Sequence, residues 1–236
     1  MKKALFILTV LFMAFQQSAC SQSNTQDKPQ VTPQTPAKET PQEKPQGNTN
    51  ETLVLIKTSL GDITAKLYND TPKHRDNFIK NIKEGWYEDS PFHRIIKGFM
   101  VQGGGNKDGR QDPGYTVPAE ILPNHIHVKG ALAAARTADQ VNPQKASSGC
   151  QFYIVQGGIM NEETLNSYEQ RYGTKFSAEQ RKAYTTIGGA PWLDGGYTVF
   201  GEVISGFEVI DKLAAVPTGP GDKPVNPVTM KIEIVD

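Results

Sequence analysis

The sequence predicts a mainly β domain: a closed barrel of about eight short strands, capped at its ends by two helices and interrupted by a helical insertion. Three observations support this fold class. Apolar and polar residues alternate in residues 61–68 and 228–235, which is the period of a strand with one buried face. Further short apolar runs follow one another between turn residues along residues 51–236. Helical patterns are few and isolated, as is typical of a closed barrel.

The chain begins with the features of an export signal, which we predict to cover residues 1–19. Two lysines precede an apolar run of about a dozen residues, whereas a membrane-spanning helix needs roughly 20. Ser18 and Ala19 then place small residues directly before Cys20, which resembles the lipobox of bacterial lipoproteins, although Gln17 replaces its usual Leu. We therefore expect cleavage before Cys20 and lipidation of that cysteine, with several acyl chains as the membrane anchor. The alternative is an ordinary signal peptide cleaved at a small-residue site.

Residues 20–50 combine this cysteine with a segment rich in Pro, Gln, Thr and Lys that has almost no large apolar residues. Such a composition cannot bury enough surface to fold, and spaced prolines favour extended polyproline II. The sequence thus predicts a disordered tether that holds the domain of residues 51–236 away from a membrane. Because Ser21 rather than an acidic residue follows the cysteine, we expect an anchor in the outer membrane, with the domain in the periplasm.

The domain is predicted to begin with a β-hairpin and a helix. Residues 52–68 contain two alternating segments on either side of the turn sequence SLG. Thr71 offers a capping hydroxyl before Pro72 at the first helical position, and Gly85 is suited to end the helix. Further strands are expected at residues 93–97, 99–103, 130–135, 151–155, 197–203 and 228–235, and a second helix at residues 207–215.

Residues 157–191 have a different character and are predicted to be a helical insertion between two strands. Asn161 is a candidate N-cap for a first helix. That helix would carry Leu165, Tyr168 and Tyr172. Ser177 and Gln180 form the sequence pattern of a capping box for a second helix, which Gly188 and its neighbouring glycine would stop.

Composition and isolated motifs narrow the function classes. Because 25 lysines and arginines balance 25 acidic residues, the electrostatic footprint of a nucleic-acid-binding protein is missing, and balanced charge favours a monomer.

With Cys20 lipidated, Cys150 has no disulfide partner. It is a candidate nucleophile with His93 as base, but a small buried thiol is the simpler interpretation. His125 and His127 could share a strand face as metal ligands, but no third ligand has a suitable spacing, so we predict no metal and no cofactor.

The segment FHRIIKGFMVQGGG contains the strongest candidate for a functional residue. Arg94 and Gln102 lie in it among aromatic and aliphatic side chains. A guanidinium keeps its charge, so placing it there is costly unless a function uses it or its stem packs on aromatics in a structural ion pair. A hairpin with a two-residue turn at the KG dipeptide would pair Arg94 with Val101 and direct Gln102 to the opposite face. A bend, for which Gly98 is suited, would bring both polar side chains together.

Four blocks of the sequence resemble the cyclophilins, a family of peptidyl-prolyl cis-trans isomerases. They are "FHRIIKGFMVQGG", "GALAAAR", "SSGCQFYIV" and "PWLDGGYTVFGEV", and they occur in the order that the family has. The resemblance covers residues 53–235 apart from the insertion. It implies a closed, eight-stranded antiparallel barrel with a helix at each end, proline-containing polypeptides as partners, and isomerisation of X-Pro bonds without a cofactor.

The resemblance also assigns the site, one residue at a time. Arg94 falls on the catalytic position. The substrate-binding positions fall on Phe99, Met100, Gln102, Ala135, Arg136, Gln151, Tyr153, Trp192, Leu193 and Tyr197. Three of these depart from residues that many members have: Arg136 stands for Asn, Tyr153 for Phe and Tyr197 for His. With Arg136 and Tyr197, the resemblance implies intact prolyl selectivity and leaves the neighbouring subsites unassigned. Trp192 implies sensitivity to cyclosporin A.

The chemistry of isomerisation explains why an arginine suits this position. An X-Pro bond isomerises slowly because resonance holds the amide planar, and twisting it gives the proline nitrogen a lone pair. A hydrogen-bond donor aimed at that nitrogen binds the twisted state better than either planar state. The resemblance assigns this donor to Arg94. We therefore expect an isomerase that assists the folding of exported proteins at the cell envelope.

Two further expectations accompany this function. The alternative to an enzyme is a non-catalytic module or chaperone that binds proline-containing segments on the same fold. Because residues 157–191 lead directly into Trp192, we also expect the insertion to border the pocket and tune access to it.

Overall fold

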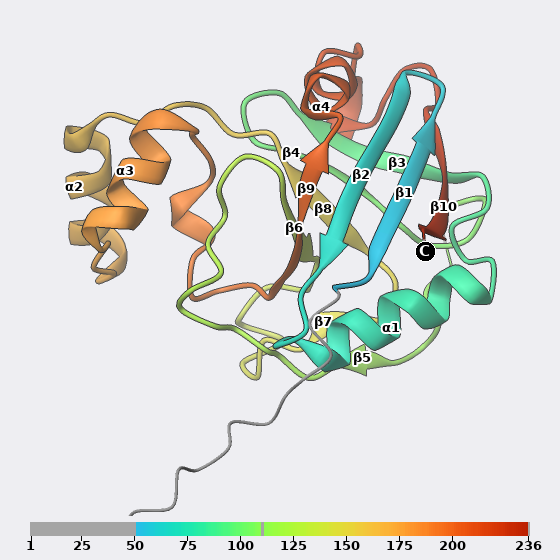
Figure 1. Cartoon of the computed structure of the whole chain (residues 1–236), viewed down its shortest axis with the longest axis horizontal. Coiled ribbons are helices and arrows are strands. Elements are labelled where there is room, and N and C mark those ends of the chain that lie inside the picture. The colour runs from blue at the N-terminus through green and yellow to red at the C-terminus, as the bar shows by residue number, and fades with distance from the viewer. Residues whose placement is uncertain (1–50, 110, 236) are drawn as a thin grey trace, which may run out of the picture. The chain divides into compact units, whose positions relative to one another are not determined.

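The computed structural model describes residues 51–109 and 111–235, which belong to one compact unit (Figure 1). The predicted signal peptide, Cys20 and the tether lie outside the described residues. Within the described part of the chain, no helix has the length and apolar character needed to cross a membrane.

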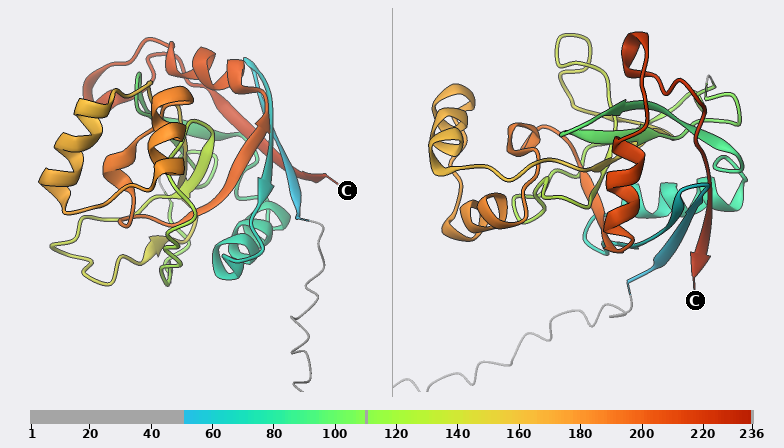
Figure 2. Two further views of the ribbon diagram at one scale, coloured as in Figure 1. Left: turned by 60° about the vertical axis from the view of Figure 1, so that its left-hand side comes forward. Right: turned by 90° about the horizontal axis from the view of Figure 1, so that it is seen from above.

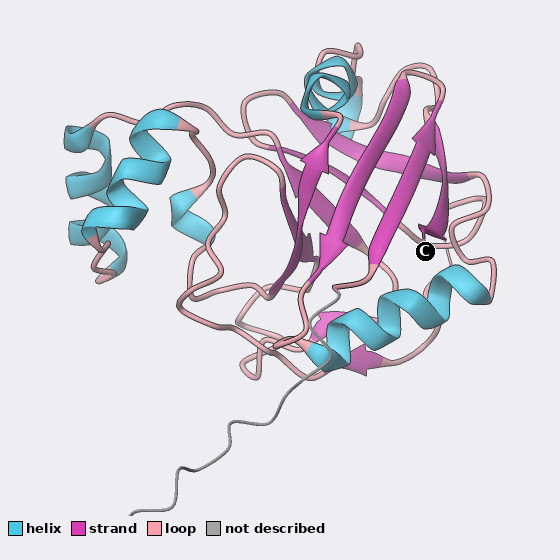
Figure 3. Ribbon diagram, viewed as in Figure 1, coloured by secondary structure: helices cyan, strands magenta, loops and turns pink. Residues whose placement is uncertain are grey.

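Eight strands close into an antiparallel barrel, which confirms the predicted fold class (Figure 3). Around the barrel their order is β1-β10-β3-β4-β8-β6-β9-β2. The strands are β1 (Leu53–Thr58), β2 (Gly61–Leu67), β3 (Ser90–Ile96), β4 (Met100–Gly103), β6 (Ala131–Ala134), β8 (Phe152–Val155), β9 (Val199–Ser205) and β10 (Thr229–Val235). A second sheet of only β5 (Thr116–Val117) and β7 (Ser147–Ser148) was not predicted, because two-residue strands leave no alternating pattern to read.

The barrel interior is filled by the apolar side chains that alternate along the strands. Val54, Ile56, Ile63 and Leu67 of the first hairpin are fully buried. This hairpin has the predicted short turn, since Thr58 pairs with Gly61. Phe78, Phe152 and other aromatic rings pack edge-to-face and tilted within the same core. The barrel is therefore a packed core rather than a channel, so any binding site must lie outside it or at its ends.

Two helices cover opposite ends of the barrel, as predicted. Helix α1 (Pro72–Lys83) lies below the strands in Figure 1 and α4 (Phe207–Ala214) lies above them. The expected cap of α1 is wrong, because the Thr71 side chain makes no capping hydrogen bond. Instead, the backbone N–H groups of Lys73 and His74 donate to the carboxylate of Glu120 at 3.1 and 3.0 Å. A carboxylate at the positive end of the helix satisfies these groups better than a hydroxyl, but no local sequence pattern announces a partner so far along the chain.

The insertion forms two helices, α2 (Glu162–Tyr172) and α3 (Ala178–Thr186), followed by the short 3₁₀ helix η1 (Pro191–Leu193). The right view of Figure 2 shows α2 and α3 standing to one side of the barrel. Both predicted caps are confirmed: Asn161 accepts from the backbone of Thr164, and Ser177 makes a complete capping box. Leu165, Phe176 and Tyr184 form a small separate core for the pair.

Candidate active site

The hairpin of β3 and β4 places Arg94 and Gln102 on the same face of the barrel wall. The loop between the strands has three residues rather than two, so that Ile96 pairs with Met100 and Arg94 pairs directly with Gln102. Gly98 makes this possible with a φ of +79°, in the left-handed region that favours glycine. The expected bend is therefore confirmed, because one extra loop residue moves Gln102 onto the face of Arg94.

A pocket of about 390 Å³, counting the space open to solvent, lies on this outer face. It is lined by Arg94, Phe99, Met100, Gln102, Ala135, Arg136, Tyr153, Leu193 and Tyr197. All nine were predicted as site residues. Gln151 and Trp192, the other two predicted residues, contact lining residues: Gln151 bonds to Gln102, and the Trp192 ring packs against Phe99. Strands β3, β4 and β8, η1, the residues that follow β6 and the loop before β9 thus contribute to a single hollow, which combines apolar side chains with two cations.

Arg94 has one ion-pair partner that sequence reasoning missed. Its Nε lies 3.4 Å from a carboxylate oxygen of Asp222, and both side chains are nearly half exposed. An exposed pair of this kind contributes only about 0–1 kcal/mol. The contact uses Nε alone, so the guanidinium is not locked away from the pocket that it lines.

Gln102 is held by a second amide. Its Nε2 donates to Oε1 of Gln151 at 3.2 Å, so the two predicted glutamines act as one unit. Gln151 also lines an adjoining hollow of about 550 Å³, which shares Gln102, Ala135 and Arg136 with the first pocket. The two hollows therefore adjoin each other and share part of their lining.

Arg136 and Tyr197, two of the departures from the family pattern, form a single unit. The Arg136 guanidinium lies 4.4 Å from the centre of the Tyr197 ring, a cation–π contact. Its Nε donates to the carbonyl of Gly196 at 2.7 Å, Nη1 donates to the carbonyl of Thr137 at 2.9 Å, and Asp139 forms an ion pair with it. Since its side chain is only 4% exposed, Arg136 acts as a wall of the pocket rather than a free donor.

The third departure, Tyr153, is explained by a buried hydrogen-bond chain beneath the pocket. Its hydroxyl lies 3.0 Å from Nε2 of His127, whose Nδ1 lies 2.8 Å from Asp194. A carboxylate only accepts, so Nδ1 of His127 donates to Asp194, and Nε2 shares the second hydrogen bond with the Tyr153 hydroxyl. Tyr184 of α3 donates to the other oxygen of Asp194 at 2.5 Å. We call Tyr153, His127, Asp194 and Tyr184 the buried relay; it joins the pocket floor to the insertion.

Trp192 lies between the pocket and the insertion. Its ring is tilted against Phe99 with centroids 5.3 Å apart, and against Tyr168 of α2 at 5.6 Å. Phe99 in turn lines the pocket. The insertion thus reaches the pocket through one aromatic contact at the surface and through the buried relay below, as expected from its place before Trp192.

Cys150, His125 and His127 each make separate side-chain contacts. Burial, assisted by the charge of Asp112, raises the pKa of the Cys150 thiol to about 11, and its sulfur contacts Ser148 and Asp112. His125 pairs with Asp70 at 2.7 Å, away from the relay to which His127 belongs. Among the residues that the structure describes, no three His, Cys, Asp or Glu side chains are grouped to hold a metal ion.

Comparison with known proteins agrees with this arrangement. Residues 53–234 match the family model for the cyclophilin type peptidyl-prolyl cis-trans isomerase/CLD domain. A Staphylococcus saprophyticus protein named "Putative peptidyl-prolyl cis-trans isomerase" is 36% identical over 202 residues, which cover 83% of this chain and 98% of that protein. A Staphylococcus aureus protein of the same name is 36% identical over 191 residues, covering 79% and 91% of the two chains.

Solved structures give the same result. A Cryptosporidium parvum cyclophilin type peptidyl-prolyl cis-trans isomerase aligns with a TM-score of 0.59 at 26% identity, covering 79% of this chain and 99% of that one. The same protein crystallised in the presence of the dipeptide Ala-Pro aligns with a TM-score of 0.58. The match of the family model over most of the chain, the two relatives and the shared barrel lead to one conclusion: this chain belongs to the cyclophilin-type peptidyl-prolyl cis-trans isomerases.

Proposed function

We propose that this enzyme isomerises X-Pro bonds of exported polypeptides at the cell envelope, with Arg94 as the donor to the proline nitrogen. The observation that carries the proposal is the direct pairing of Arg94 with Gln102 at the edge of an apolar pocket. The Cryptosporidium parvum relative crystallised with Ala-Pro supports a proline-containing ligand for the same kind of pocket.

In this proposal the pocket holds one side of the twisting bond while the other side rotates. Phe99, Met100 and Leu193 bury the proline ring, and the buried relay fixes the Tyr153 ring beneath it. Gln102, held by Gln151, receives the substrate backbone. Arg94 remains charged at every relevant pH and donates to the nitrogen only when the amide is twisted, which lowers the barrier rather than merely binding the substrate.

Turnover separates this function from the alternative of a non-catalytic binding module. The measurement is the cis–trans exchange rate of an Ala-Pro peptide by NMR exchange spectroscopy, with and without catalytic amounts of the protein. An isomerase accelerates exchange far beyond the uncatalysed time of tens to hundreds of seconds. A binding module shifts the peptide resonances on titration and leaves the exchange rate unchanged, which would disprove the catalytic proposal.

We expect kcat/KM to be flat between about pH 7 and pH 9. Burial raises the pKa of Tyr153 well above its usual value, and Arg94 does not lose its proton in this range. Burial, assisted by the charge of Arg94, lowers the pKa of His93, so this neighbour is already neutral at pH 7. The check is kcat/KM against pH at constant ionic strength. A bell-shaped profile would indicate a titrating acid and base and would contradict the proposed role of Arg94.

The location at the envelope rests on the signal and lipobox read from residues 1–20. We expect Cys20→Ser to release the protein from the membrane fraction and to abolish labelling by a fatty-acid analogue, because an acylated cysteine supplies the anchor. Peptide isomerisation by the released protein should equal that of the wild type, which is the control for folding. Labelling by the fatty-acid analogue that persists in Cys20→Ser would overturn the lipid anchor. Inhibition by cyclosporin A, expected from Trp192, remains a prediction for the same assay.

A further inference from the structure

Four aromatic rings follow one another from the proline pocket onto the outer helix of the insertion. Phe99 and Trp192 have centroids 5.3 Å apart, Trp192 and Tyr168 are 5.6 Å apart, and Tyr168 stacks on Tyr172 at 5.9 Å. We call these four residues the aromatic ladder. Its first member lines the pocket, so the ladder is continuous with the proposed site of catalysis.

Packing of the insertion accounts for only part of this stripe. Leu165, Tyr168 and Tyr172 follow helical spacing along α2, and Leu165 is fully buried in the small core of the insertion. The stripe then continues outward, with Tyr168 and Trp192 partly buried and Tyr172 49% exposed. Contiguous exposed aromatic surface beside a binding pocket is typical of a surface that binds a partner.

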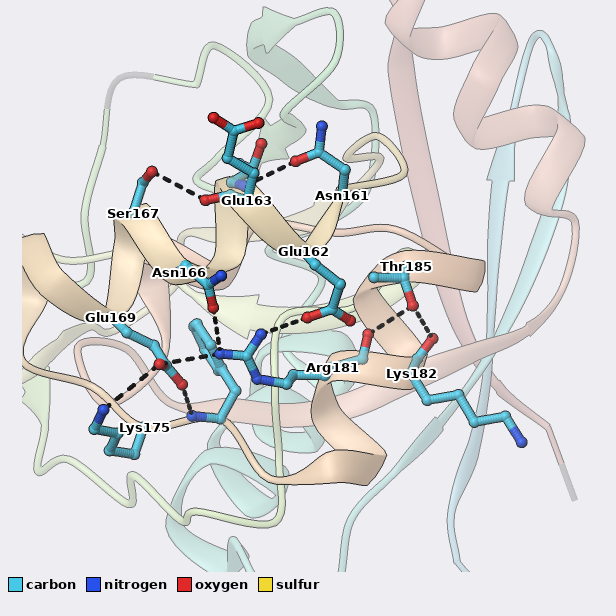
Figure 4. Close-up of polar contacts among 12 residues, drawn as sticks. Asn161, Glu162, Glu163, Asn166, Ser167, Glu169, Lys175, Arg181, Lys182 and Thr185 are labelled. Atoms are coloured by element: carbon cyan, nitrogen blue, oxygen red, sulfur yellow. Dashed lines mark hydrogen bonds and ion pairs between the residues drawn. The ribbon is translucent and has the colours of Figure 1, made fainter.

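The helices beneath the ladder are braced by one arginine, as Figure 4 shows. From α3, Arg181 reaches across to α2, where it bonds to Glu162 at 2.5 Å, Asn166 at 2.9 Å and Glu169 at 3.0 Å. Glu169 also accepts from the backbone of Phe176 in the connecting loop. The α2 face that carries Tyr168 and Tyr172 is therefore formed before any ligand arrives, which reduces the entropy lost on binding.

We propose that the aromatic ladder is an extended subsite for the same polypeptide that places its proline in the pocket, an inference that rests on the proposed isomerase function. The ladder spans at most about 17 Å from Phe99 to Tyr172, a distance covered by about five residues of extended chain at ~3.3 Å each. Its rings select an aromatic, prolyl or aliphatic side chain at about that separation from the isomerised proline. Unfolded segments expose such side chains, whereas folded proteins bury them.

The test uses peptide substrates that differ in whether a side chain can reach the aromatic ladder while the proline occupies the pocket. One is a tetrapeptide with a single X-Pro bond. The others are peptides of about twelve residues with one proline and a tryptophan about five residues before or after it, a spacing that reaches Tyr172. In a matched set, serine replaces the tryptophan. Binding is measured by fluorescence anisotropy and turnover by cis–trans exchange, so the ladder is tested even if turnover fails.

The variants are Tyr168→Ala and Tyr172→Ala, with Tyr168→Phe as the variant that keeps the ring. Ile187→Ala is the control, since it removes an exposed apolar side chain from the same insertion outside the ladder. In the wild type, tryptophan on one side of the proline should lower Kd and KM relative to serine by roughly two- to tenfold, the contribution of one aromatic contact. Each alanine variant should remove this gain and leave kcat on the tetrapeptide unchanged, while Tyr168→Phe and Ile187→Ala preserve the gain.

Several outcomes would overturn the ladder as a subsite. Equal affinity of the wild type for the tryptophan and serine peptides would be one such outcome. A second would be alanine variants that lose as much activity on the tetrapeptide as on the long peptides, because that loss indicates a structural role. Concentration-dependent dimerisation that Tyr172→Ala abolishes would assign the surface to a second copy instead. By contrast, an absence of turnover with the ladder-dependent gain in binding intact would disprove the isomerase proposal and leave the subsite standing.

Discussion

Arg94→Ala is expected to lower kcat/KM for X-Pro isomerisation by roughly 10²–10³, the effect of removing one donor that serves only the transition state. The planar substrate does not accept this hydrogen bond from the guanidinium, so KM should change much less than kcat. The measurement is cis–trans exchange of a short Ala-Pro peptide at low temperature, where the uncatalysed rate is slow. Because Arg94 is 41% exposed and its side chain closes no core cavity, the variant should keep the thermal stability of the wild type.

Two companion variants test whether the effect belongs to the guanidinium itself. Arg94→Lys keeps the positive charge but loses the planar fork of donors, so it should recover only part of the lost rate. Asp222→Ala removes the ion-pair partner and should change kcat/KM by less than about threefold, since an exposed contact at 3.4 Å positions the arginine weakly. An Arg94→Ala enzyme within about threefold of the wild-type rate would refute the assignment, because a transition-state donor contributes far more.

The register of the β3–β4 hairpin shows how far sequence reasoning extends. Strand periods and spacing predicted the barrel, because a half-buried strand must alternate whatever lies beside it. The register between two strands does not follow from this alternation. A single additional loop residue at Gly98 decides whether Gln102 faces Arg94. Local pattern allowed both registers, and only the resemblance to a family favoured the one that forms.

No local sequence pattern revealed the side-chain contacts between residues that lie far apart in the chain. Glu120 caps α1 and Asp222 pairs with Arg94, yet each lies far along the chain from the group it contacts. Tyr153 did carry a usable signal, because a hydroxyl in place of the family's usual phenylalanine must find a hydrogen-bond partner when buried. The sequence analysis did not use this requirement, and the structure shows that the partner is His127.

Asp194→Ala is expected to destabilise the domain by about 3–5 kcal/mol, because three buried donors lose their acceptor at about 1–3 kcal/mol each. The Asp194 carboxylate accepts from the backbone and ring of His127 at 2.9 and 2.8 Å and from the Tyr184 hydroxyl. His127 and Tyr184 are fully buried, so their polar groups would find no water in exchange. For a domain of this size, the melting temperature should fall by roughly 10 °C.

Graded variants of the buried relay distinguish the loss of these hydrogen bonds from a loss of stability that any substitution in this region would cause. Asp194→Asn keeps one acceptor oxygen and should be intermediate, and Tyr153→Phe, which leaves only His127 Nε2 unpaired, should cost about 1–3 kcal/mol. Asp139→Ala is the matched control, because its carboxylate pairs with Arg136 while 62% exposed and should cost no more than about 1 kcal/mol. Urea unfolding with an unchanged m-value measures each difference. If Asp194→Ala cost no more than Asp139→Ala, the relay would not hold the pocket floor to the insertion, and Tyr153 would owe its position to ring packing alone.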